Sequence, residues 1–283
     1  MELSRRNRED RMKIYISVDM EGVAGVTHGD HVKLEGGEYE TARKWMTAEA
    51  NAAIEGALEG GATEVVIADS HGQMRNILPD ELHEDALLVR GSPRPLSMME
   101  GLDETFAAVF FVGYHSMAGE PKGILAHTYS SRVVYTVRLN GVSVGEAGFN
   151  AAIAGHFGVP VALACGDDTL DAEIKALMPW TQRVVTKWAI TPSAARNLTP
   201  KMAQKQIRAG AKQALTRLSE MKPLTLEPPI RLEVRFMQSA SADRAADIPG
   251  VQRIDGRTLL YEDTDMLRIN RVWRLMLNVG FIP

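Results

Sequence analysis

Three short, mostly apolar runs in the sequence are each followed by side chains that can bind a metal ion or transfer a proton. The runs are residues 13–18, 63–68 and 107–112. Asp19 and Glu21 follow the first run, His71 follows the second and His115 follows the third. Such runs, rich in β-branched and aromatic residues, are typical of buried parallel strands. Because the ligand site of an open parallel sheet lies beyond the carboxyl ends of its strands, we expect these four side chains to meet.

The chemistry that these residue types share is the binding of a divalent metal through oxygen and nitrogen. Asp19 and Glu21 are two residues apart, so their side chains point the same way in an extended segment. Two neighbouring carboxylates repel each other unless a cation or a proton lies between them. The chain has one cysteine, Cys165, which excludes an internal disulfide and a zinc-ribbon site. Any bound metal must therefore be held by His, Asp and Glu.

Two further candidate residues lie downstream of the third run. His127 falls in the loop 123–128, and Glu146 falls between a predicted hairpin and the helix that follows it. Taken alone, Glu146 is also typical of an acid in the first turn of a helix. The remaining histidines lack a cluster of candidate ligands around them and are predicted to be bystanders. They are His28, His31, His83 and His156.

The rest of the chain alternates between apolar runs and segments with helical periodicity. Helices are predicted over residues 39–59, 147–157, 170–177, 199–221 and 263–278. Further strands are predicted over residues 87–90, 159–164, 230–237 and 258–261, with a hairpin over 132–144 that turns at Asn140-Gly141. This order predicts an α/β fold with a mostly parallel sheet flanked by helices. We expect the metal site at the carboxyl ends of the strands, and a smaller mixed α+β region at the C-terminus.

These patterns divide the chain into three parts. Residues 1–11 are polar and charged and are expected to form a flexible N-terminal arm. Residues 12–191 carry the alternation of strands and helices and are expected to form an α/β metal-binding catalytic domain. Residues 192–283 begin where this alternation stops and are expected to form a C-terminal α+β region.

Composition excludes several classes of function. The 283 residues include 32 Lys and Arg against 36 Asp and Glu, for a net charge of -4, so nucleic-acid binding is not expected. The sequence has neither an apolar signal segment nor a run of 18 apolar residues, so we expect a cytoplasmic protein without membrane association. It also lacks the glycine-rich motifs that cradle phosphates.

The segment around Asp19 carries the pattern S-x-D-x-E-G over residues 17–22. This pattern resembles the first motif of the zinc-dependent D-aminopeptidase family, the M55 peptidases. The resemblance continues through residues 69–71, 99–103, 113–115, the His127 loop, 144–146 and 166–168. It extends from Met12 to about Leu224 and is looser beyond that point.

The resemblance implies two zinc ions in each subunit. The metal ligands that it implies are Asp19, Glu21, His71, His115 and Glu146. Asp19 resembles the carboxylate that bridges the two ions, and His127 resembles a histidine proposed to be catalytic in the family. The resemblance also implies a cytoplasmic homo-oligomer, a decameric ring, with the site enclosed inside it.

The function that follows is a dinuclear zinc aminopeptidase that removes the N-terminal residue of short, D-amino-acid-containing peptides. A metal-activated water is expected to attack the scissile carbonyl, with His127 as acid and base or as nucleophile. We favour the acid–base role because imidazole titrates near pH 7. The alternative is a dinuclear amidohydrolase acting on a small non-peptide amide or a phosphoester. A metal-binding or peptide-binding protein, or a structural ring subunit, is disfavoured because all six candidate residues are present.

Overall fold

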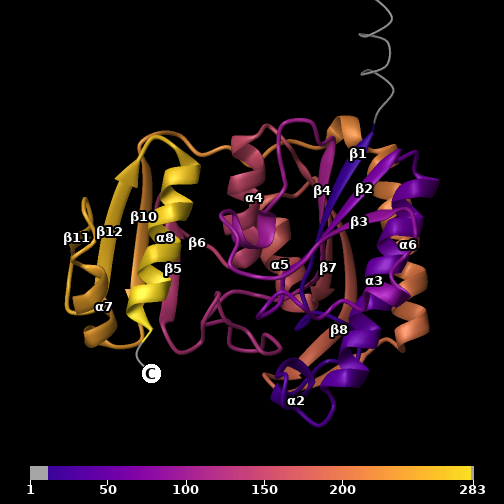
Figure 1. Cartoon of the computed structure of the whole chain (residues 1–283), viewed down its shortest axis with the longest axis horizontal. Coiled ribbons are helices and arrows are strands. Elements are labelled where there is room, and N and C mark those ends of the chain that lie inside the picture. Colours follow the sequence, from indigo (N-terminus) through magenta and orange to yellow (C-terminus); the bar gives the residue numbers. More distant parts are fainter. Residues whose placement is uncertain (1–11, 282–283) are drawn as a thin grey trace, which may run out of the picture.

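The computed structural model describes residues 12–281 of the chain (Figure 1). The predicted flexible arm, residues 1–11, lies outside the described residues. Two β-sheets stand side by side, the larger on the right of Figure 1 and the smaller on the left, and helices pack against both. The α/β fold class predicted from the sequence is confirmed.

The larger sheet has the strand order β3-β2-β1-β4-β7-β8-β9. Its strands are β1 (Lys13–Val18), β2 (Glu64–Asp69), β3 (Ala86–Val89), β4 (Ala108–Tyr114), β7 (Val161–Asp167), β8 (Gln182–Thr191) and β9 (Ala194–Asn197). Neighbouring strands pair in parallel, except that β9 runs antiparallel to β8. Ser17 of β1 lies opposite Ala68 of β2 and Phe111 of β4. The carboxyl ends of these three central strands therefore meet at one edge.

Helices cover both faces of the larger sheet. They are α3 (Tyr39–Glu59), α4 (Glu146–His156), α5 (Asp168–Leu177) and α6 (Pro200–Thr216), with the short α2 (Gly29–Val32) before α3. Alternate residues of β1 serve the two faces: Ile14 and Ile16 pack with α3 and α6, whereas Tyr15 packs in the core that contains α4 and α5. No helix within residues 12–281 has the length and apolar character to cross a membrane.

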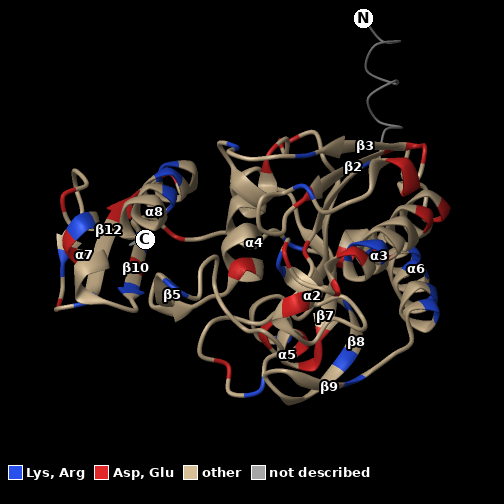
Figure 2. Ribbon diagram, turned by 60° about the horizontal axis from the view of Figure 1, so that its bottom comes forward, with Lys and Arg blue, Asp and Glu red and all other residues tan. Residues whose placement is uncertain are grey.

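Helices α3 and α6 approach each other closely. A Cβ atom at Gly56 would lie 2.3 Å from the backbone oxygen of Arg208, so only glycine permits this spacing. Around the contact, acids of α3 face bases of α6 (Figure 2), with ion pairs from Arg208 to Glu55 and Glu59 and from Lys212 to Glu59. These exposed pairs add little stability each, and the apolar interface holds the two helices on the sheet.

The smaller sheet is antiparallel, with the order β11-β12-β10-β5-β6. Its elements are β5 (Val134–Leu139), β6 (Val142–Ser143), β10 (Ile230–Phe236), β11 (Gln252–Arg253) and β12 (Thr258–Asp263), with helices α7 (Ser239–Ala245) and α8 (Met266–Gly280). The predicted hairpin joins β5 to β6, with φ of 47° at Asn140 and 82° at Gly141. The buried Trp273 of α8 packs on Phe149 of α4, with ring centroids 5.8 Å apart. Helix α8 thus links the smaller sheet to the helical layer of the larger one.

The structure differs from the sequence predictions in several elements. Strands β8, β9 and β11 and helices α2 and α7 are not among the predicted elements, and the helix predicted over 199–221 ends at Thr216. Short 3₁₀ turns occupy Pro79–Glu81, Ser97–Met99 and Leu218–Glu220. Strand β9 and helix α6 follow residue 192 yet pack with the larger sheet, while β5 and β6 precede it and belong to the smaller one. The domain limits stay a prediction.

Candidate metal centre

The segment after β1 carries Asp19 and Glu21 and is bonded to the end of β4. The N–H of Gly22 donates a hydrogen bond of 2.7 Å to the carbonyl of Gly113. A Cβ atom at Gly22 would lie 1.8 Å from the backbone oxygen of Tyr114. The glycine of the first motif is therefore required by packing, and this packing fixes where the two acids stand.

His71 follows β2 and faces both acids. Its Nδ1 lies 3.0 Å from Oε2 of Glu21 and 3.3 Å from Oδ1 of Asp19. Its Nε2 lies 2.8 Å from the carbonyl oxygen of Val32, which accepts its proton. This bond fixes the ring and leaves the Nδ1 lone pair directed at the carboxylates.

His115 follows β4 on the other side of Asp19. The turn before it uses Gly113 at φ 68°, where a Cβ atom would lie 2.2 Å from the carbonyl oxygen of Asp19. Nδ1 of His115 donates to the carbonyl of Ser116 at 2.9 Å. Nε2 lies 3.5 Å from Oδ2 of Asp19 and 3.4 Å from Oε1 of Glu146. This buried Nε2 has no hydrogen-bond partner among residues 12–281.

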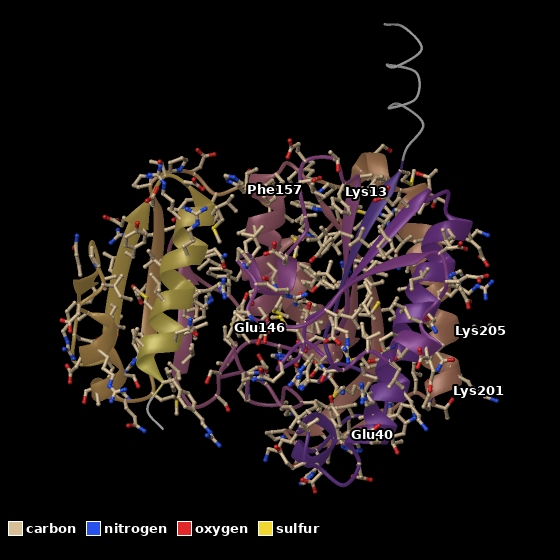
Figure 3. The ribbon with its side chains drawn as sticks, in the orientation of Figure 1. Lys13, Glu40, Glu146, Phe157, Lys201 and Lys205 are labelled. Atoms are coloured by element: carbon tan, nitrogen blue, oxygen red, sulfur yellow. The ribbon has the colours of Figure 1, made fainter. Side chains whose placement is uncertain are left out.

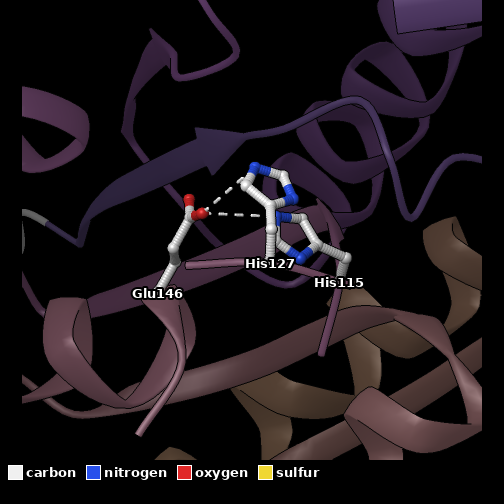
Figure 4. Close-up of side chains that lie close together, drawn as sticks. All are labelled: His115, His127 and Glu146. Atoms are coloured by element: carbon white, nitrogen blue, oxygen red, sulfur yellow. Dashed lines mark ion pairs between the residues drawn. The ribbon is translucent and has the colours of Figure 1, made fainter. Parts of the chain in front are cut away.

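Glu146 begins α4 and lies at its lower end in Figure 3. Its Oε1 accepts a hydrogen bond of 2.7 Å from the N–H of Tyr129 and lies 3.6 Å from Nε2 of His127. Nδ1 of His127 donates to the carbonyl of Leu125 at 2.9 Å. The rings of His115 and His127 stack beside the carboxylate (Figure 4).

The loop that carries His127 holds two bulky residues in the left-handed backbone region. Leu125 has φ of 52° and Tyr129 has φ of 58°. Side chains with a Cβ atom seldom adopt this conformation, which costs on the order of 1–3 kcal/mol for each residue. Tyr129 is also the residue whose N–H donates to Glu146. The backbone is therefore strained on both sides of His127.

The charges of this cluster are strongly coupled. Burial, and then the charge on Glu21, raise the pKa of Asp19 to about 7. Burial works against a charged His71 and a charged His115, yet the facing carboxylates prevail and raise the pKa of both rings well above the usual range. The buried carboxylates therefore require positive charge close by, either as protons on the imidazoles or as metal ions.

Two overlapping sets of side chains within the described residues can hold a metal ion. One set is Asp19, Glu21 and His115, and the other is His115, His127 and Glu146. In each set the ligand atoms lie within 4.8 Å of one another. The predicted His71 touches the first set through Glu21 and Asp19, so all six predicted side chains form one cluster. The four predicted bystander histidines contribute to neither set.

Sequence patterns miss two buried residues that support this cluster. The ammonium of Lys187 donates to the carbonyls of Glu21, Val23 and Val26, which form the loop after β1. The carboxylate of Glu49 accepts from the N–H of Ala24 in the same loop at 2.8 Å. A lysine within a strand and a glutamate within an alanine-rich helix are weak signals, because only the tertiary fold brings them to this loop.

A buried group of carboxylates and imidazoles, at the carboxyl ends of the strands of an α/β sheet, defines the class of metal-dependent α/β enzymes. Within that class, the chain belongs to the D-aminopeptidase family, the M55 peptidases, whose family model matches residues 12–275. The resemblance found in the sequence motifs is thereby confirmed.

Two comparisons show what this chain is similar to within the family. The chain is 37% identical over 271 residues to the D-aminopeptidase of Bacillus subtilis (strain 168), covering 94% of this chain and 96% of that protein. It is similar in structure, with a TM-score of 0.92 and 35% identity, to the Zn-dependent D-aminopeptidase DppA from Bacillus subtilis, described as a self-compartmentalizing protease. That match covers 95% of this chain and 98% of the other.

Proposed function

We propose that the protein is a dinuclear zinc aminopeptidase that releases the N-terminal residue of short peptides containing D-amino acids. The observation that carries this proposal is the buried Nε2 of His115, which lies between the carboxylates of Asp19 and Glu146 without a hydrogen bond among the described residues. A cation at this point would satisfy all three groups. Membership of the D-aminopeptidase family and the zinc dependence of the similar Bacillus protein support zinc as that cation.

The proposed ligands are Asp19, Glu21, His71, His115 and Glu146. The two oxygens of Asp19 face different histidines, because Oδ1 lies 3.3 Å from His71 and Oδ2 lies 3.5 Å from His115. This arrangement suits a carboxylate shared by two ions. The donor set contains only oxygen and imidazole nitrogen, and both histidines are oriented by backbone carbonyls, as metal-binding histidines commonly are.

Zinc bound there supplies a water of lowered pKa and a Lewis acid for the scissile carbonyl. The chain itself supplies orientation, proton transfer and exclusion of water. Asp19, Glu21 and Glu146 are almost wholly buried, so charge that develops on the substrate meets little competing solvent. His127 is the most exposed member of the cluster, and its Nε2 is the nitrogen directed toward Glu146.

We assign His127 the role of general acid and base. Because Nδ1–H donates to the carbonyl of Leu125, Nε2 is the nitrogen that can take up and release a proton during catalysis. From that position His127 can protonate the leaving amine of the cleaved peptide. In the runner-up role, Nε2 attacks the scissile carbonyl directly, which would form a covalent acyl-imidazole and release the leaving amine. The variant His127→Ala tests both roles.

A homo-oligomer is part of the same proposal. The similar Bacillus protein is described as a self-compartmentalizing protease, and we propose that this chain also assembles into a ring, of ten subunits, that encloses the site in the cytoplasm. Light scattering coupled to size-exclusion chromatography tests the number of subunits. A monomer at micromolar concentration would contradict this part of the proposal.

The decisive experiment combines metal content with stereospecific turnover. Zinc per subunit is measured on the purified protein, and release of the first residue is followed from matched D-Ala and L-Ala peptides with and without chelator. We expect two zinc ions, turnover of the D-Ala peptide and its loss with chelator. Turnover of a small non-peptide amide or a phosphoester in place of both peptides would establish the alternative function.

A further inference from the structure

A cavity of about 420 Å³ opens beside the metal centre and is lined by His71 itself. Three arginines line it: Arg43 of α3, Arg75 in the loop after β2, and Arg90 after β3. Within the part of the chain that the structure describes, the cavity has no Asp or Glu in its lining. This wall is positive in a chain whose net charge is -4, so its charge is a local feature of the fold.

The three arginines are only partly engaged. Arg43 donates from Nε to the carbonyl of Asn76 at 2.8 Å and forms an ion pair of 3.3 Å with the exposed Glu40. Arg90 donates to the carbonyl of Arg75 at 3.3 Å. Among residues 12–281, neither Arg75 nor Arg90 forms an ion pair, and the guanidinium of Arg75 makes no hydrogen bond. Two of the three cations thus lack a counter-ion.

The cavity lies against one side of the proposed metal site, at His71. Of the five proposed ligands, His71 has the most exposed side chain, at 11%, against 1–6% for the other four. The ring of His71 separates the cavity from the carboxylates: Nδ1 faces Glu21, and Nε2 faces Val32, which lines the cavity. The ring of His71 is therefore shared between the cavity and the proposed metal site.

We propose that this cavity binds a carboxylate of the peptide substrate and selects for substrates that carry one. The inference rests on the proposed aminopeptidase function and names its specificity. Guanidinium groups match carboxylates in planar, paired hydrogen bonds. The carboxylate has two sources, the free C-terminus of a short peptide or the side chain of an acidic residue. Either source holds the peptide beside His71 while its scissile bond lies at the centre.

The test measures kcat/KM for three matched D-Ala peptides: a free acid, its C-terminal amide, and an amide that carries a D-Glu side chain. The variants are Arg75→Gln and the double variant with Arg90→Gln, and Arg271→Gln on α8 is the matched control, an exposed arginine outside the cavity. We expect wild-type protein to prefer one carboxylate peptide over the plain amide by about tenfold or more. The double variant loses that preference and the control keeps it.

The pattern of loss identifies the source of the carboxylate. Loss confined to the free acid assigns the C-terminus, and loss confined to the D-Glu peptide assigns the side chain. KM for the preferred peptide also rises with salt, because the attraction is screened.

Equal rates on all three peptides, or an equal fall on all three in both variants, overturn the inference while the aminopeptidase function stands. Wild-type protein that cleaves none of the three contradicts the proposed function itself. Zinc content and circular dichroism verify that each variant folds, and Arg75→Gln alone removes no hydrogen bond seen among the described residues.

Discussion

The imidazole rings of His115 and His127 stack with centroids 4.2 Å apart and an interplanar angle of 11°. Both rings donate Nδ1–H to a backbone carbonyl and direct Nε2 at the same oxygen of Glu146. Their exposure differs, since the side chain of His115 is 1% exposed and that of His127 is 21% exposed. Two imidazolium ions in contact repel each other. This contact fits the proposed roles, in which the buried His115 binds metal as a neutral ring and the more exposed His127 transfers a proton.

Replacing His127 with alanine separates these two roles. We expect His127→Ala to lower kcat by about 10²–10⁴-fold, because the proton donor for the leaving amine is lost, with zinc content unchanged. A peptide-cleavage assay measures kcat, and metal analysis of the purified variant measures its zinc content. The variant His156→Ala, distant from the cluster, serves as control. Full turnover in the zinc-loaded variant would exclude both the acid–base role and the nucleophilic role of His127. Loss of one zinc ion would identify His127 as a ligand.

Replacing Asp19 tests the shared carboxylate. Asp19→Asn keeps the size of the side chain but removes the charge that faces both His71 and His115. Loss of a residue that only hydrogen-bonds a metal ligand typically lowers metal affinity by roughly 10–100-fold. We expect Asp19→Asn to lower zinc affinity by more than this, because Asp19 is itself a proposed ligand. Competition with a chromogenic chelator measures this affinity, with the exposed Asp80→Asn as control. A variant that retains two tightly bound zinc ions would show that Asp19 does not bridge them.

Removing the metal should also destabilise the protein. An ion that binds only the folded state adds about 4 kcal/mol of stability at a thousandfold excess over its dissociation constant. For a chain of this size we expect a fall in melting temperature of roughly 8 °C or more on adding chelator. Differential scanning calorimetry at fixed protein concentration, with zinc restored as control, provides the measurement. An unchanged transition would mean that the cluster is stable without a cation.

Much of this fold follows from local patterns. Apolar periodicity predicts α3 at its observed ends, and its termination follows from Gly60 and Gly61. The hairpin follows from the Asn140-Gly141 turn. Strand β8 is harder to predict, because buried and half-buried positions mix along it and the buried ones include Lys187. Helices as short as α2 and α7 offer too few turns for periodicity to show.

The candidate site is predictable to the same degree and for a similar reason. Strand ends converge in a parallel sheet, so Asp19, His71 and His115 can be grouped from sequence order alone. Glu146 resembles an ordinary first-turn acid, and only its contacts with His115 and Tyr129 distinguish it. The binding of metal by these candidate ligands stays a prediction. The groups that hold the loop in place act through backbone carbonyls and amides, which no sequence motif records.

Lys187 is the stronger of these supports. Its fully buried ammonium satisfies three carbonyls of the loop after β1, and burial lowers its pKa to about 8. We expect Lys187→Met to cost about 2–5 kcal/mol of unfolding free energy, because these carbonyls lose their donor, and to weaken zinc binding through the displaced Glu21. Urea unfolding and zinc titration measure the two effects, with the exposed Lys205→Met as control. Unchanged zinc affinity in a folded variant would limit Lys187 to a purely structural role.

Glu49 should make stability depend on pH. Burial raises its pKa to about 7, above the value near 4.3 of an unfolded glutamate. The folded state therefore binds more protons than the unfolded state between these two pH values. The stability contributed by Glu49 is present below pH 4.3 and is lost as pH rises through 7.

Glu49→Gln mimics the protonated acid and keeps an acceptor for the N–H of Ala24. We expect the variant to gain about 1–3 kcal/mol over the wild type at pH 8 relative to pH 5.5. Urea unfolding of the zinc-saturated proteins at both pH values measures this difference, and the exposed Glu35→Gln should show none. A difference of the opposite sign would mean that Glu49 is ionised in the folded protein and stabilised by the nearby Lys187.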